Sequence, residues 1–168
     1  RGSTKRSRIM LKFRALTPNE LSELETEFKH FLVINAIYDD EWRQLAANNP
    51  SKAQEFIDLF SNIVLEKVYT KLPGLLHIGL DFITVFDFQK DIWNFYHFQL
   101  PSHISLSEVN ADNFLAFLQT SWSELTLKKG TKKSSEQKAE QVHALICKGA
   151  SPLQAHALQE FLQLFNAV

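Results

Sequence analysis

The sequence contains one cysteine, Cys147, and one methionine, Met10, among its 168 residues. A single cysteine forms no intrachain disulfide, which excludes a secreted domain held together by disulfides and favours a cytoplasmic location. Glycine and proline number only five each, so we expect short loops. No apolar run approaches the roughly 20 residues that cross a bilayer, and we expect no membrane partner.

The sequence also lacks the short motifs that mark common catalytic sites. It has no HExxH or CxxC, which are typical of zinc sites, and no glycine-rich phosphate loop. The GxSxG turn that exposes a nucleophilic serine is missing as well. We therefore expect no cofactor, and the sequence argues against an enzyme. A metal-dependent or cysteine enzyme stays open as an alternative.

Apolar and charged residues are both abundant, and the charges are segregated. Hydrophobic residues make up 45% of the chain and 14 of them are phenylalanines, as expected of a packed core. Residues 1–14 carry a charge of +6, residues 15–127 carry −10, and residues 128–168 carry +3. We interpret residues 1–9 as a remnant of an expression vector or a flexible basic arm. Residues 10–168 are predicted to form a single globular domain.

Capping residues and apolar spacing predict five or six helices. The first begins at the capping box Thr17–Glu20 and continues to about Leu32. The acids Asp39, Asp40 and Glu41 are interpreted as the start of the next helix, because negative charge stabilises that end. The remaining helices are predicted to start at Ser51, near Asn110 or Asp112, at Ser134, and at the capping box Ser151–Gln154.

Between residues 75 and 100 the pattern changes to runs of β-branched and aromatic residues, which favour strands. The predicted strands are Leu76–Ile78, Ile83–Phe88 and Ile92–Phe98. We expect Phe86 and Phe88 on one face, with Trp93, Phe95 and His97 on another. The predicted fold class is α+β: a mostly helical domain of five or six helices packed on a small antiparallel sheet of two to four strands.

Three stretches resemble a family of short uncharacterised proteins from Bacteroidetes bacteria. They are Met10–Leu21, the block from Pro50–Ala53 through Phe60–Val68, and Lys129–Ser134 followed by Gly149-Ala150. The resemblance implies a cytosolic domain that starts at Met10. It implies no activity, and no functional residue is carried over from it.

Four lysines form the most suggestive local feature. Lys128, Lys129, Lys132 and Lys133 surround Gly130-Thr131 in a predicted loop directly before a helix. A helix N-terminus offers free N–H groups and partial positive charge, so the loop is a candidate site for anionic ligands or RNA. The alternative is a solvated loop without a ligand.

Histidines and the single cysteine provide two weaker candidates. His97 and His103 flank Leu100-Pro101 and are candidate metal ligands, although ordinary hydrogen-bonded histidines fit the pattern too. His143 lies four residues before Cys147 on a predicted helix, a spacing that suits a reactive thiol. The alternative is that Cys147 is a small buried hydrophobic residue.

The sequence favours a non-enzymatic cytoplasmic protein-interaction or regulatory domain. Its partner is expected to be another protein, recognised through charged surfaces such as the acidic ridge of Glu20, Glu23 and Glu27. Nucleic acid is a weaker candidate, because most of the chain is acidic. The sequence predicts no oligomeric state.

Overall fold

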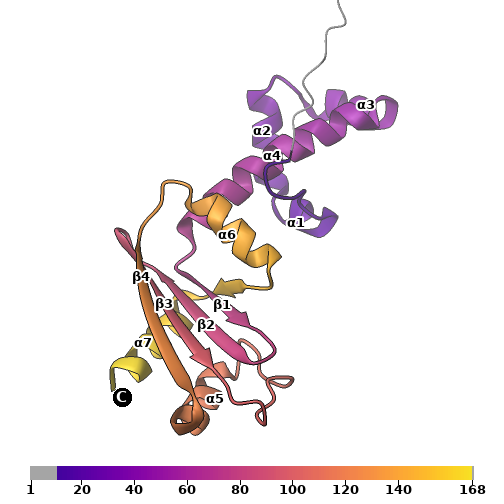
Figure 1. The fold of residues 1–168 in the computed structure, drawn as a ribbon. Helices are drawn as coiled ribbons and strands as arrows, with labels where there is room; N and C mark the ends of the chain where they lie inside the picture. Colours follow the sequence, from indigo (N-terminus) through magenta and orange to yellow (C-terminus); the bar gives the residue numbers. More distant parts are fainter. Residues whose placement is uncertain (1–10, 168) are drawn as a thin grey trace, which may run out of the picture. The chain divides into compact units, whose positions relative to one another are not determined.

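The computed structural model describes residues 11–167, and these residues fold into two compact units that are divided between Val68 and Tyr69. The long helix α4, Pro50–Lys71, begins in the first unit and ends in the second (Figure 1). The single domain over 10–168 therefore stays a prediction. The interpretation of residues 1–9 lies outside the described residues.

The first unit is helical. It contains α1 (Pro18–Glu23), α2 (Glu25–Ile34), α3 (Asp39–Asn48) and most of α4. Its core is aromatic, with the Phe28 ring 5.2 Å from that of Trp42 and 5.1 Å from that of Phe60. The buried Ser61 hydroxyl accepts a hydrogen bond from the Leu16 N–H at 2.9 Å, which attaches the segment before α1 to α4.

Two of these helices begin differently from each other. The capping box at Thr17 is confirmed, since the Glu20 N–H donates to Thr17 Oγ1 at 3.2 Å and the Thr17 N–H donates to Glu20 Oε1 at 2.9 Å. The predicted start at Ser51 is wrong by one residue: α4 begins at Pro50, and Asn49 Oδ1 accepts from the Lys52 N–H at 3.3 Å. Proline fits the first helical position because its missing N–H would have no partner there.

The second unit is built on an antiparallel sheet with the strand order β4-β3-β2-β1-β5. The three predicted strands are confirmed as β1 (Gly74–Ile78), β2 (Phe82–Phe88) and β3 (Ile92–Gln99). The sequence did not predict β4 (Thr126–Lys133) or β5 (Ser151–Leu153). The α+β class is confirmed, but both predicted counts were too low: residues 11–167 contain seven α-helices and five strands.

Helices cover both faces of this sheet. One face packs on α5 (Phe114–Ser121) and α7 (Ala155–Ala167), with a 3₁₀ turn, η1 (Trp122–Glu124), following α5. The fully buried side chains of this core include Ile83, Val85, Phe98, Phe114, Leu118 and Phe161. The other face lies against α6 (Lys138–Cys147) (Figure 1).

The strand register places four aromatic residues on the face toward α6. Phe86 pairs with Phe95 and Phe88 pairs with Trp93, and their ring centroids lie 5.5 Å and 5.0 Å apart. Directly paired residues of an antiparallel sheet share a face. The expectation that Phe86 and Phe88 lie on a different face from Trp93 and Phe95 was therefore wrong.

Three further predictions were wrong for the same physical reason. The predicted lysine loop is strand β4, the predicted helix start at Ser151 is strand β5, and α6 begins at Lys138 instead of Ser134. β4 and β5 pair with β3 and β1, and the Ser134 N–H donates to the Asp91 carbonyl at 2.9 Å, so backbone groups of all three segments bond to residues distant in sequence. Local capping patterns do not reveal such partners.

Candidate functional site

The four lysines lie along β4, at one edge of the sheet, and all are exposed. Lys129 Nζ lies 5.4 Å from the ring centroid of Tyr96, and Lys132 Nζ lies 5.7 Å from that of Trp93. They do not precede a helix directly, so the helix-terminus argument for anion binding fails. Lysines on an edge strand commonly prevent edge-to-edge pairing with other chains. Anion binding by Lys128, Lys129, Lys132 and Lys133 stays a prediction.

The two candidate metal ligands have different partners. His97 lies on β3, with Nδ1 2.8 Å from Thr84 Oγ1, and its ring packs against Phe82. His103 is exposed, and its Nε2 lies 3.5 Å from Glu124 Oε1. Within residues 11–167 no three His, Cys, Asp or Glu side chains lie close enough together to hold a metal ion. Over this range the pair therefore has no third ligand.

The cysteine and its neighbouring histidine do lie together. Cys147 Sγ is 3.5 Å from His143 Nε2, as the spacing of four residues along α6 predicts. The thiol is exposed, so the alternative that Cys147 is a small buried hydrophobic residue is wrong. The His143 ring also lies 5.9 Å from that of Tyr69. The reactivity of the Cys147 thiol stays a prediction.

The predicted acidic ridge is only partly available at the surface. Arg14 holds Glu20 with two hydrogen bonds, from Nη1 at 2.7 Å and Nη2 at 2.9 Å. These bonds, together with the Thr17 N–H, lower the pKa of Glu20 to about 2. The helix breaks after Glu23, where Leu24 has φ −101° and ψ 24°, and Glu27 follows on α2. No glycine or proline marks this break in the sequence.

A surface that is both apolar and acidic lies at the turn between α2 and α3. The Ala36 N–H donates to the Val33 carbonyl at 2.9 Å and the Ile37 N–H donates to the Leu32 carbonyl at 2.8 Å, which is a Schellman motif. The turn leaves three large apolar side chains at the surface: Val33 is 47% exposed, Ile34 71% and Tyr38 58%. Exposed apolar side chains that cluster in this way are typical of interaction sites.

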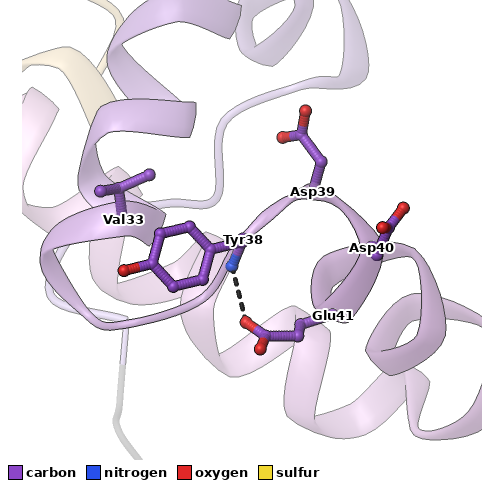
Figure 2. A pocket seen from close by; sticks show the side chains of 5 residues that line it. All are labelled: Val33, Tyr38, Asp39, Asp40 and Glu41. Carbon is purple, nitrogen blue, oxygen red and sulfur yellow. Dashed lines mark hydrogen bonds between the residues drawn. The ribbon is translucent and has the colours of Figure 1, made fainter.

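The same turn surrounds a hollow of about 480 Å³, lined by Val33, Tyr38, Asp39, Asp40 and Glu41. Figure 2 shows Tyr38 beside Val33, with Asp39 and Asp40 projecting from the first turn of α3. Glu41 turns back, and its Oε2 accepts a hydrogen bond from the Tyr38 N–H at 2.8 Å. Glu41 therefore caps the helix, as predicted for this acidic triplet, and Asp39 and Asp40 supply the exposed charge.

Sequence reasoning missed the apolar half of this surface. Val33 and Ile34 lie beyond Leu32, where the sequence predicts that the first helix ends. The signal that marks them is the apolar run Val33–Tyr38, interrupted only by Asn35, which continues past that predicted end. We define Val33, Ile34, Tyr38, Asp39 and Asp40 as the α2–α3 surface.

Fold and surface together define an α+β protein with a helical unit, a sheet unit, and an apolar surface bordered by acids. The model of DUF6495, a family of unknown function, matches residues 10–166, and the chain belongs to this family. No curated protein and no solved structure matches the chain. Within the described part of the chain, every helix is too short or too polar to cross a membrane.

Proposed function

We propose that this protein is a non-enzymatic interaction domain that binds a basic, apolar segment of another protein through the α2–α3 surface. One observation carries the proposal: the turn exposes three large apolar side chains by 47% to 71%, and two of them, Val33 and Tyr38, line a hollow together with Asp39 and Asp40. Water contact with these side chains is unfavourable, and a partner that covers them removes it.

The composition of the surface favours one chemistry of partner. Fully burying an exposed Ile or Tyr side chain contributes about 1.5–3 kcal/mol, and tyrosine is a frequent anchor in interfaces. The exposed carboxylates of Asp39 and Asp40 attract a basic segment and repel an acidic one. Of the two, Asp40 has only a weak partner, Arg43, at 3.7 Å, with both side chains largely exposed. An amphipathic segment with lysines or arginines beside its apolar residues satisfies both features.

The proposal includes a cytoplasmic location and an origin in Bacteroidetes bacteria. A chain with one cysteine suits a reducing compartment, which supports the location. The similarity of Met10–Leu21 and of the α4 block to proteins of that phylum supports the origin.

A synthetic amphipathic helix of leucine and lysine tests the surface directly. In a titration followed by two-dimensional NMR, we expect the amide signals of residues 33–41 to shift. Ile34→Ser is expected to weaken binding about tenfold, because it removes one buried apolar anchor. Asp39→Asn combined with Asp40→Asn is expected to weaken it about threefold at low salt, and less at high salt.

Two controls make this experiment specific. Leu80→Ser changes a 95% exposed leucine in the other unit, so the affinity for the peptide is expected to stay unchanged. A leucine–glutamate peptide of the same pattern is expected not to bind. Equal losses in Ile34→Ser and Leu80→Ser, or equal binding of both peptides, would contradict the proposal.

A second candidate function, binding of anionic ligands or RNA along β4, is supported by one observation: the four exposed lysines share one edge strand. Contacts with phosphates release counterions, so the affinity for a single-stranded RNA should fall steeply as salt rises. A gel-shift titration with wild type and Lys128→Gln tests this. If RNA is not retained at low salt, this candidate is rejected.

A further inference from the structure

The sheet unit contains a second hollow, between the sheet and α6. It has a volume of about 310 Å³ and is lined by Phe86, Phe88, Trp93 and Phe95 of the sheet and by Ala144 and Leu145 of α6. Four aromatic rings and two aliphatic side chains make it apolar. Phe86, Phe88 and Trp93 are almost fully buried, so sheet and helix hold these rings in place.

One cation lies at the edge of this hollow. Lys132 and Gln141 complete its lining, and Lys132 Nζ donates to Gln141 Oε1 at 3.0 Å, joining β4 to α6. An ammonium group has three N–H donors, so this bond leaves two for another acceptor. A second lysine, Lys138, lies 5.0 Å from the Phe88 ring centroid, but it does not line the hollow and is only partly exposed. Lys132, which is exposed, is thus the cation open to a ligand.

Strand β4 leaves the Phe95 ring of this hollow uncovered at one position, Gly130. Gly130 pairs with Phe95 and lies two residues from Lys132, so it occupies the same face of the sheet. A Cβ atom at position 130 would contact the Phe95 ring at 3.8 Å. Because glycine has no side chain, nothing from this position covers Phe95, which is only partly buried.

We propose that this hollow binds a small aromatic carboxylate, with its ring against Phe95 and Trp93 and its carboxylate on Lys132. An enclosed apolar cavity of roughly 150 Å³ accommodates benzene, and ligand pockets usually begin near 300 Å³. A hollow of about 310 Å³ therefore suits a body of one or two rings. The ring replaces water against the aromatic side chains, and the carboxylate accepts a charge-assisted hydrogen bond.

The three tryptophans provide a site-specific readout. Trp93 lines the hollow, whereas Trp42 lies in the helical unit and Trp122 lies in η1. In an NMR titration with 2-naphthoate, we expect the indole N–H signal of Trp93 to shift and those of Trp42 and Trp122 to stay in place. The neutral isostere 2-naphthamide is expected to bind about fivefold more weakly, because it lacks the charge that Lys132 recognises.

Matched variants separate the two halves of the site. Lys132→Gln should weaken 2-naphthoate about fivefold and leave 2-naphthamide unchanged, and Lys132→Arg should retain binding. Lys133→Gln removes the same charge from the opposite face of β4, so both affinities should be unchanged. Ala144→Phe, at an exposed position on α6, should fill the hollow and abolish binding of both probes while the circular dichroism spectrum is retained.

Three results would overturn the proposal: no shift of the Trp93 signal, equal shifts of all three indole signals, or equal effects of Lys132→Gln and Lys133→Gln. Neither the probe nor the variants involve the α2–α3 surface. Failure here consequently leaves the proposed interaction function standing, and the reverse also holds.

Discussion

Two helices, one in each unit, end in the same hydrogen-bonding pattern but place different residues at its critical position. After α2, Ala36 adopts φ +60°, and after α6, Gly149 adopts φ +114°. In both ends the next residue donates back to the last turn, Ile37 to the Leu32 carbonyl and Ala150 to the Leu145 carbonyl. Positive φ costs an L-residue with a Cβ atom energy that glycine does not lose.

This difference shows where the backbone is strained. The sheet unit uses glycine and ends α6 without strain, whereas the helical unit holds an alanine in a left-handed conformation. That alanine lies between Ile34 and Tyr38, within the turn that exposes the apolar half of the α2–α3 surface. Strained backbone often accompanies functional segments, which agrees with the proposed interaction site.

The largest change in stability is expected when Gly149, which follows α6, is replaced by alanine, the residue that follows α2 at the equivalent position. Gly149→Ala places a Cβ atom 3.1 Å from His77 Nε2, in addition to the unfavourable φ. We expect the free energy of unfolding to fall by about 1–2 kcal/mol, measured by urea denaturation of the full chain.

Gly130→Ala is the matched control for that substitution. Its Cβ atom would meet only Phe95, at an ordinary contact distance of 3.8 Å, and its backbone is extended within β4. The stability should change by less than about 0.5 kcal/mol. If the two glycine substitutions are equally destabilising, backbone conformation is not what distinguishes Gly149.

The sequence predicted the elements whose signals are local. The Thr17 capping box and the strands β2 and β3 were predicted, because each depends on neighbouring residues. β4 and β5 were missed, since they are strands only by pairing with β3 and β1. The lysines of β4 are depleted in strands generally, which favoured the wrong prediction of a loop.

The candidate sites were predicted less well than the fold, for a related reason. The contact between His143 and Cys147 follows from helical spacing and was predicted. Exposure of Ile34 and Tyr38 depends on how the turn at Ala36 directs the chain, and its left-handed conformation has no signal in an alanine. The hollow beside Trp93 depends on the register of β3 with β2 and on the position of α6, neither of which is local.

An intermediate change in stability is expected when Ala36, which follows α2, is replaced by glycine, the residue that follows α6 at the equivalent position. Ala36→Gly relieves the left-handed strain but raises the entropy of the unfolded chain, so we expect a net gain of roughly 0.5 kcal/mol in the free energy of unfolding. Ala46→Gly, at an exposed position within α3, should instead lose about 1 kcal/mol. Chemical denaturation of both variants gives the sign, and equal losses would show that Ala36 is not strained.

The smallest change in stability is expected at a helix start. The helices α1 and α6, one in each unit, begin in different ways. The start of α1 depends on a charged group, Glu20, whereas α6 begins at Lys138 with no side-chain cap. The hydrogen bonds from Arg14 and from the Thr17 N–H lower the pKa of Glu20 to about 2 in the folded protein. In the unfolded chain this carboxyl titrates near its ordinary value of about 4.3.

The depressed pKa of Glu20 fixes the sign of its pH dependence. Because the folded state binds the proton less tightly, the stabilisation from Glu20 is fully present above about pH 4.3 and is lost as the pH falls through about 2. The pair is largely exposed to solvent, so the effect should be only about 0.3 kcal/mol. The stability of wild type minus that of Glu20→Gln should therefore shrink as the pH falls from about 5 to about 2. In Arg14→Gln the carboxyl signal of Glu20, followed by NMR, should titrate at a higher pH, since its principal hydrogen-bond donor is gone. An unchanged midpoint in that variant would show that Arg14 does not hold the start of α1.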